Sequence, residues 1–593
     1  MEHQCPGCRS SLTRSLKRES GSTSVENELN ELADLIARLQ RGEWTRAEFR
    51  GHSVHYGVYT QRQTDRFFVR MRVPYGIISP LQLTALAAAI ETWGRDECHF
   101  TTRQGVEVHD LRLEQVVPFL RALAQAGLLS HETGGNSIRS ILVCPHAGVG
   151  TDEPFDVTPY AELLTRYFVR HPDFQTLPRK MKIAFSGCER DCVRSFAQDL
   201  GFQARKNANG ECGFRVLAGG GTGALPRLGQ ELIEFLPAEQ MCSFTEAFLR
   251  VFNRLGDRQN RRRARVKFLV QSLGIQALLE EITRERTELQ REQKSYPSLG
   301  PVSESPAEPV PGLAKSESLE RAEKQPAEDE TFSSWVTVQT QPQPQRGFRT
   351  VRVSLAAGSI TAGQLRQLAA LSERFRLAIR TTPEQGFLLR QARDNQLSQI
   401  YQALDGAQLL HRLAVSRLVA CPGSKACSNA FTNTPALAQA ITARLALLPD
   451  PTDTLAQLSI RLCGCSNGCG LHAVADIGLE GLANRAQNDW LPAYRLWLGG
   501  RESQSRPRFG EDLGMMPARH VPACVADVAE FYLASRQPGE SLADLLDRVG
   551  VGPFSTLLKK HQLEPAHDRR ELAIDWGEAE RYRPRGVNEA GVC

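Results

Sequence analysis

The sequence predicts an α+β fold made of two tandem halves that repeat each other as a pseudo-two-fold pair. Three observations lead to this prediction: a stretch rich in Pro, Ser, Glu and Gln near the middle of the 593-residue chain, a strand–helix–strand pattern on each side of it, and cysteines in a common register in both halves. A chain of this length can form several domains, each with a core of its own.

The central stretch covers residues 293–345 and contains few apolar side chains. Such a composition cannot bury enough apolar surface to offset the entropy lost on ordering. We therefore predict a disordered linker over 293–345, which divides the chain into two halves of comparable size.

Each half begins with the same order of predicted elements. An alternating strand, a glycine turn and an amphipathic helix occupy residues 67–93 and again residues 349–375. A second strand beginning with a threonine pair follows in each half, in HFTTRQGVEVHD and in LAIRTTPEQGFLLRQ. The repeat predicts a small α+β sheet module at 48–125 and another at 346–412.

The larger modules, predicted at 126–292 and 413–535, share their cysteine spacing. Cys144 precedes Cys188 by 44 residues, and Cys421 precedes Cys465 by the same 44. Another cysteine follows four positions later in each half, and the stretches FRVLAGGGTG and YRLWLGGRES also correspond. A duplication is the simplest explanation. The remaining segments are an N-terminal segment at 1–47 that carries Cys5 and Cys8, and a C-terminal tail at 536–593 that ends in Cys593.

Four thiolates gather in the second half, in the motifs CPGSKAC and CSNGC. The cysteines are Cys421, Cys427, Cys465 and Cys469. Such a set suits a [4Fe–4S] cluster or a structural zinc ion, and buried structural thiols are a third interpretation. The wide C-x5-C and C-x3-C loops favour the cluster, because zinc modules typically use C-x2-C. The glycines among the cysteines let backbone N–H groups approach cluster sulfurs.

The two halves differ in what they retain. The position of the first half that corresponds to Cys427 is Gly150, so Cys144, Cys188 and Cys192 form an incomplete set. We interpret these three as a buried relic of the duplicated site, although a second cluster completed by Asp152 stays open. Cations show the reverse pattern, because the second half has Ser or Gln opposite the following residues: Arg72, Arg139, Lys180 and Lys182. Face-to-face halves would combine cations and thiolates in one composite site.

The motifs CPGSKACSNAFTNT and CGCSNGCG, with LPRKMKIAFSGC and GFRVLAGGG, resemble those of siroheme-dependent sulfite and nitrite reductases. The resemblance covers about 50–290 and 346–535. It implies a ferredoxin-like module and a siroheme- and cluster-binding module in each half, with siroheme and a [4Fe–4S] cluster as cofactors. It also implies that Cys469 bridges the cluster to siroheme iron, that Arg103 and His109 contact siroheme, and that a substrate-binding quartet is formed by Arg72, Arg139, Lys180 and Lys182. Glu107 stands where the family usually has an amide.

The expected function is therefore that of an oxidoreductase that reduces sulfite to sulfide with six electrons. The alternative within the class is reduction of nitrite to ammonium, and Lys182 favours sulfite because nitrite-reducing relatives of the plant type tend to carry Asn there. A non-catalytic iron–sulfur electron carrier is the alternative of another class. Electrons would come from a ferredoxin or a flavoprotein, since we find no flavin or nicotinamide domain.

Composition and charge point to a soluble protein. The net charge is +5, and the sequence has no long apolar run and no export signal near its N-terminus. We therefore expect a cytoplasmic protein that binds neither nucleic acid nor a membrane. In that compartment the 15 cysteines favour metal or redox chemistry over disulfides.

Overall fold

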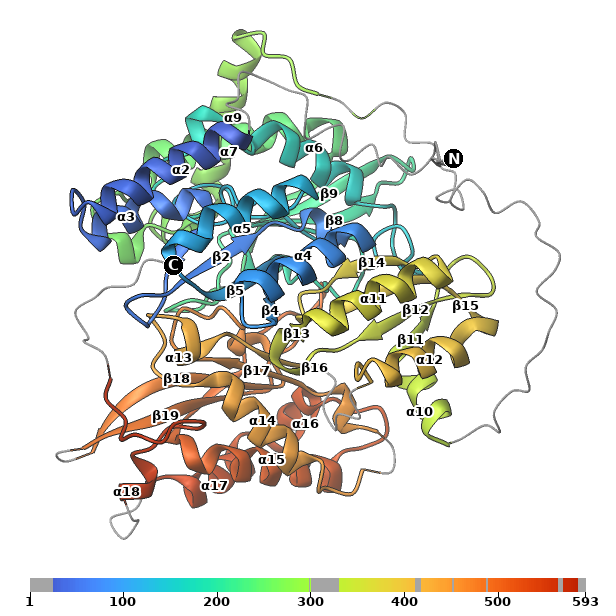
Figure 1. The fold of residues 1–593 in the computed structure, drawn as a ribbon. Helices are drawn as coiled ribbons and strands as arrows, with labels where there is room; N and C mark the ends of the chain where they lie inside the picture. Colours follow the sequence, from blue (N-terminus) through green and yellow to red (C-terminus); the bar gives the residue numbers. More distant parts are fainter. Residues whose placement is uncertain are drawn as a thin grey trace, which may run out of the picture.

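The structure is a computed structural model that describes residues 25–297, 299, 330–410, 417–450, 453–486, 489–563 and 569–584 (Figure 1). Cys5, Cys8, Cys593 and most of the predicted linker lie outside these residues. The described chain forms four five-stranded sheets, two in each half, which confirms the α+β fold with two repeats. No helix among the described residues is long and apolar enough to cross a lipid bilayer.

The elements of the first half are, in chain order, α2 (Val25–Gln40), α3 (Arg46–Ser53), β1 (Val58–Thr60), β2 (Phe67–Met71), β3 (Ile77–Ile78), α4 (Pro80–Trp93), β4 (Glu97–Phe100), β5 (Val106–Leu111), α5 (Leu113–Gln125), β6 (Leu142–Val143), α6 (Thr158–Phe168), β7 (Ile183–Ser186), β8 (Leu200–Lys206), β9 (Cys212–Ala218), β10 (Gln230–Pro237), α7 (Met241–Leu255), α8 (Val266–Leu273) and α9 (Ile275–Arg291).

The elements of the second half are, in chain order, α10 (Glu330–Gln339), β11 (Thr340–Pro342), β12 (Phe348–Val353), β13 (Ser359–Thr361), α11 (Ala362–Phe375), β14 (Ala378–Thr381), β15 (Phe387–Arg393), α12 (Leu397–Gly406), β16 (Arg417–Ala420), α13 (Gly423–Ala426), α14 (Thr434–Leu445), β17 (Ser459–Cys463), β18 (Ile477–Ala486), β19 (Asp489–Leu498), β20 (Glu511–Pro517), α15 (Val521–Ser535), α16 (Leu542–Val549), α17 (Gly552–His561) and α18 (Arg569–Leu572).

The two small modules exchange strands. β13 of the second half pairs antiparallel with β4 of the first, and β3 of the first half pairs antiparallel with β14 of the second. The sheets therefore have the matching orders β1-β2-β5-β4-β13 and β11-β12-β15-β14-β3. Helices α4 and α11 pack side by side over this junction (Figure 1). Because the apolar residues of both modules form one continuous core, the halves are held in a fixed mutual orientation.

The two large modules have the same sheet topology. In β6-β7-β8 and in β16-β17-β18 the strands run parallel, and two antiparallel strands complete each sheet. A buried carboxylate also recurs: Asp199 accepts the backbone N–H of Lys182 at 2.8 Å, and Asp476 accepts that of Ser459 at 2.9 Å. Lys182 and Ser459 are the residues matched in the sequence comparison, so the pseudo-two-fold relation extends to single hydrogen bonds.

The prediction of a linker up to residue 345 is wrong at its C-terminal end. α10 and β11 occupy residues 330–342, and the Trp335 ring packs against Tyr401 with centroids 5.2 Å apart. The few apolar residues of FSSWVTV are enough to form one short helix, and the flanking Pro- and Gln-rich sequence obscured them.

The two terminal segments also contain more structure than predicted. The segment predicted as a tail from residue 536 contains α16 and α17, which bury Leu545, Leu546, Phe554 and Leu558 against the second large module. At the other end, α2 lies inside the predicted 1–47 segment and packs on α5 through an apolar stripe at helical spacing.

Candidate functional site

A cavity between the two halves brings the predicted thiolates and most of the predicted cations together. It encloses about 1200 Å³ of space, part of it open to solvent. Both small modules and both large modules contribute to its wall. The charged and thiol side chains that line it are Arg70, Arg103, Glu107, Arg139, Lys180, Lys182, Cys421, Cys427, Cys463, Cys465 and Cys469.

The four motif cysteines lie on three loops of the second half. Cys421 directly follows β16, Cys427 directly follows α13, and Cys465 and Cys469 lie on the loop after β17. β16 and β17 are adjacent parallel strands, so the loops that follow them meet at one edge of the sheet. The pairing of β16 with β17 thus brings Cys421 and Cys465 together, although they are 44 residues apart in the sequence.

Residues of the first half fix the Cys469 loop. The Thr102 hydroxyl donates a hydrogen bond to the Cys469 carbonyl at 2.8 Å, and the Thr222 hydroxyl donates to the Gly468 carbonyl at 3.0 Å. Gly468 has φ +65°, and a Cβ at this position would lie 2.4 Å from the Thr222 carbonyl oxygen. Only glycine fits this position. The sequence did not reveal either threonine, because their contacts cross between the halves.

The cysteine arrangement fits a cluster better than a single ion. The sulfur atoms of the four cavity cysteines are too far apart to bind one ion together. Among the described residues, only Cys144, Cys188 and Cys192 form a group with ligand atoms within 4.8 Å of one another. The Gly464 N–H donates to the Cys421 sulfur at 3.2 Å, which is the kind of contact that stabilises cluster-bound sulfur. The residues present therefore fit a [4Fe–4S] cluster.

Arg70 takes the place predicted for Arg72. It lies opposite Glu107 on the paired strands β2 and β5, and its Nε donates to the Glu107 carboxylate at 2.6 Å. Its guanidinium also lies over the Tyr59 ring, 4.9 Å from the centroid. Burial raises the pKa of the Glu107 carboxyl, but Arg70 and His109 outweigh that effect and hold it well below the usual value.

Arg72 does not line the cavity, so its assignment to the substrate quartet is wrong. Its side chain is 8% exposed and donates to the carbonyl oxygens of His131, Glu132 and Ile138 at 2.8, 3.0 and 3.2 Å. The reason is that β2 ends at Met71 and the chain turns. The alternation that would place Arg70 and Arg72 on one face of a strand does not continue past the turn.

The remaining cations of the cavity converge from adjacent backbone segments. The Arg139 N–H donates to the Met181 carbonyl at 2.9 Å, and this pairing holds the PRKMK segment beside Arg139. Lys180 and Lys182 flank Met181 and both reach the cavity. Burial lowers the pKa of the Lys182 ammonium well below its ordinary value, and the neighbouring cations Arg103, Arg265 and Lys180 lower it further.

Arg103 and His109, the residues predicted to contact siroheme, both line the cavity. The guanidinium of Arg103 donates to the Gln198 amide oxygen at 2.9 Å and also to the Ser140 carbonyl, while its buried Nε has no hydrogen-bond partner. Burial and nearby Arg139 lower the pKa of Arg103 to about 9. The Nε2 atom of His109 lies 3.2 Å from the Glu107 carboxylate. His99, buried beside it, has its pKa lowered by burial to about 4.

The charge imbalance of this cavity favours an anionic occupant. Five Arg and Lys side chains line it, and among the described residues Glu107 is its one carboxylate. Like-charged cations held together under partial burial depress one another's pKa unless anions separate them. Siroheme carries several carboxylates, so the residues present fit it. A thiolate cluster site beside a cationic cavity for a haem defines an oxidoreductase that depends on both groups.

Comparison with known proteins agrees with this class. The model of the nitrite and sulphite reductase 4Fe-4S domain matches residues 134–290 and 414–564, and the model of the nitrite/sulfite reductase ferredoxin-like half domain matches residues 59–126 and 341–407. These four segments cover most of the chain. The chain therefore belongs to the nitrite and sulfite reductase family and is an oxidoreductase with siroheme and a [4Fe–4S] cluster as cofactors.

The relatives include enzymes named for each substrate. The chain is 27% identical over 561 residues to the assimilatory ferredoxin-dependent nitrite reductase of Haloferax mediterranei, covering 89% of this chain and 90% of that one. It is 27% identical to sulfite reductase [ferredoxin] 2 of Mycolicibacterium paratuberculosis, covering 84% and 88%. Among solved structures, Mycobacterium tuberculosis NirA superposes with a TM-score of 0.73 at 25% identity, covering 90% of this chain and 96% of that one.

Proposed function

We propose that this enzyme reduces sulfite to sulfide. The observation that supports the proposal is the set formed by Arg70, Arg139, Lys180 and Lys182, all of which line the cavity that the four cysteines also line. In the balanced reaction, sulfite takes up six electrons, and protons remove its three oxygens as water. Siroheme, held by the cationic lining of the cavity, would supply the iron at which an oxyanion is reduced.

The cationic side chains would bind and orient the oxyanion. Arg guanidinium groups present paired N–H donors that match oxyanion geometry, whereas Lys supplies a compact charge. The Arg70 guanidinium is held in place by Glu107 and the Tyr59 ring, so little ordering is required when an anion binds. The anion would remain close to the four cations as its charge changes during reduction.

Lys182 would also deliver protons through its Nζ atom. A group with an ordinary lysine pKa gives up its proton poorly near neutral pH, but the lowered pKa of Lys182 brings the ammonium closer to the working range of a general acid. The Asp199 carboxylate holds the backbone of Lys182 and also binds Arg265 at 2.9 and 2.8 Å, which fixes the backbone from which the Lys182 side chain extends.

Reduction of nitrite to ammonium by the same site is the second candidate. It is favoured by the names of several relatives, including the ferredoxin–nitrite reductase of Synechococcus elongatus, which is 30% identical over 456 residues. Lys182 instead favours sulfite, because a second ammonium beside Lys180 suits an anion that carries two charges better than one that carries a single charge.

We infer that a ferredoxin supplies the electrons, since relatives of both substrate types are named for ferredoxin. The test compares steady-state rates with sulfite and with nitrite, using reduced ferredoxin in one series and a flavoprotein with NADPH in another. The holoenzyme should contain about five iron atoms per chain, four in the cluster and one in siroheme. A higher kcat/KM for nitrite than for sulfite would overturn the proposal that sulfite is the substrate. A colourless protein without iron would overturn the cofactor assignment.

A further inference from the structure

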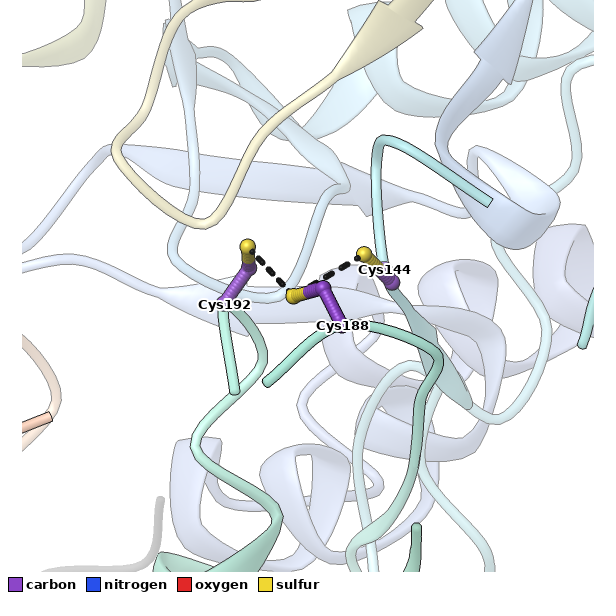
Figure 2. Close-up of side chains that lie close together, drawn as sticks. All are labelled: Cys144, Cys188 and Cys192. Carbon is purple, nitrogen blue, oxygen red and sulfur yellow. Dashed lines mark hydrogen bonds between the residues drawn. The ribbon is translucent and has the colours of Figure 1, made fainter. Parts of the chain in front are cut away.

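Three cysteines of the first half meet at a second place in the molecule, outside the cavity described above. The Cys188 sulfur lies 3.5 Å from the Cys144 sulfur and 3.0 Å from the Cys192 sulfur (Figure 2). All three sulfur atoms lie within 4.8 Å of one another. Cys144 and Cys188 are fully buried, whereas Cys192 is partly exposed.

This spacing matches a single tetrahedral metal ion. Thiolates bound to one zinc ion at about 2.3 Å lie about 3.8 Å apart, which is close to the observed separations. Thiolates on different corners of a [4Fe–4S] cluster lie much farther apart. The geometry therefore argues against the second cluster that the sequence left open. Asp152 accepts the N–H of Glu189, the residue after Cys188, at 3.1 Å, but its oxygens do not belong to the group of ligand atoms within 4.8 Å of one another.

The loop that carries two of these thiols is fixed before any metal binds. Arg194, which is fully buried, donates to the Cys192 carbonyl at 2.6 Å and is held by the Glu502 carboxylate of the second half at 2.9 Å. The amide of Gln504, also from the second half, donates to the Cys188 carbonyl at 2.7 Å. Such contacts restrict the ligand loop to one geometry, which reduces the entropic cost of metal binding.

The thiols lie at the edge of the apolar core of the first large module, to which Cys144 and Cys188 belong, and the Cys192 side faces polar groups. Cys192 lines a second cavity of about 2020 Å³, open in part to solvent, together with His146 and Arg190. Arg190 interacts electrostatically with both Cys188 and Cys192. An anionic set of three thiolates around a divalent ion would be balanced by this cation.

We propose that Cys144, Cys188 and Cys192 bind one zinc ion as thiolates, with the fourth coordination position facing the second cavity, which Cys192 lines together with His146. Each thiol gives up its proton on binding. Zinc is the metal expected for a compact thiolate set that offers nitrogen or water as the fourth ligand. The proposal does not depend on the substrate or on the cofactors of the first cavity.

The test measures zinc and iron per chain in the holoenzyme purified under reducing conditions, followed by zinc K-edge absorption spectroscopy. We expect about one zinc per chain, with three sulfur neighbours at about 2.3 Å. Cys192→Ser should lose most of the zinc and keep the iron, whereas Cys242→Ala, a buried thiol of the same half, should keep both. If Cys192→Ser fails to fold, the zinc K-edge spectrum of the unaltered protein still tests the proposal, because it counts the sulfur neighbours of the zinc directly.

Four results would overturn the proposal. They are less than about one tenth of a zinc per chain in the unaltered protein, iron in place of zinc at this site, a Cys188–Cys192 disulfide found by mass spectrometry under non-reducing conditions, and zinc that stays in Cys192→Ser. Failure of the proposed reductase function would appear separately, as absent iron or absent turnover with the zinc content unchanged.

Discussion

The two cavities between the halves occupy corresponding places in the duplicated fold but differ in charge. The first is lined by five Arg or Lys side chains and one carboxylate. The second is lined by five arginines and four carboxylates. The arginines of the second cavity are Arg190, Arg352, Arg417, Arg501 and Arg536, and its carboxylates belong to Glu384, Asp476, Glu502 and Glu540.

The difference shows how a duplicated site can specialise. The second cavity neutralises its own cations, for example through Glu502, which pairs with Arg417 at 2.9 Å and with Arg461 at 3.2 Å. The first has one carboxylate for five cations among the described residues, so its lining keeps a net positive charge that favours an external anion. Because the neutralised cavity offers little binding energy to a polycarboxylate, it is poorly suited to siroheme, while its three thiols remain available to a metal ion.

The largest expected effect comes from removing Cys469, the last cysteine of the cluster motif. Cys469→Ser should lower sulfite reduction by more than about 100-fold, because the proposed link between cluster and haem is lost. Rates with a chemical reductant and the visible spectrum of the holoenzyme measure it. Cys242→Ala is the matched control and should stay within about twofold. Unchanged activity of Cys469→Ser would refute the bridging role.

The charge balance of the second cavity should be visible as stability. Glu502→Gln leaves the fully buried Arg194 and Arg461 to share Glu384 as their remaining carboxylate, so the free energy of unfolding should fall by about 3–5 kcal/mol in urea titrations. Asp512→Asn breaks the partly exposed pair with Arg495 and should cost less than about 1 kcal/mol. Equal losses in both variants would show that this network is no more important than a surface pair.

The same network should make the folded state less stable at low pH. Burial raises the pKa of Glu384, but Arg194 and Arg461 outweigh it and lower the pKa from 4.5 to about 2. A lowered carboxyl pKa stabilises the folded state fully above the unfolded value, and this stabilisation is lost as the pH falls through the folded value. The urea concentration at the midpoint of unfolding should therefore decrease as the pH falls from about 4.5 toward 2. Glu384→Gln should make that decrease smaller. An unchanged slope in Glu384→Gln would assign the acid sensitivity to other carboxyls.

The sequence alone predicted the repeat, the four thiolates and the cavity between the halves, because these depend on spacing that survives in the chain. It failed where the backbone changes direction, as at Met71, after which Arg72 turns into the protein and Arg70 keeps the place in the cavity. It also assigned the cations to one half only. Arg352, the counterpart of Arg70 in the second half, lines the second cavity.

Arg70 and Arg352 therefore form a matched pair. Arg70→Gln should lower kcat/KM for sulfite by roughly 10- to 100-fold, since one fixed donor to the oxyanion is lost. Arg352→Gln removes the same charge at the corresponding place of the second cavity and should stay within about twofold. A comparable loss in both variants would contradict the functional difference between the cavities. An intact Arg70→Gln enzyme would remove Arg70 from the anion site.

The smallest effect tests the symmetry itself, at Gln104 and Gln385. Gln104 accepts the Val143 N–H at 3.0 Å and donates to the Thr381 carbonyl at 2.9 Å. Gln385 accepts the Ala420 N–H at 2.8 Å and donates to the Phe100 carbonyl at 3.1 Å. Both residues have positive φ, 57° and 62°.

Each glutamine thus links the small module of one half to the other half and also to the first strand of its own large module. Truncation leaves a buried N–H group and a buried carbonyl unsatisfied, so Gln104→Ala and Gln385→Ala should each lower the free energy of unfolding by about 1–3 kcal/mol. Two hydrogen bonds of each glutamine correspond, and Gln385 adds one to the Ala420 carbonyl at 2.9 Å, so its loss should be the larger by no more than about 1 kcal/mol. The double variant should be close to the sum of the two losses. A large inequality would mean that the two halves, although alike in topology, no longer share equally in holding the molecule together.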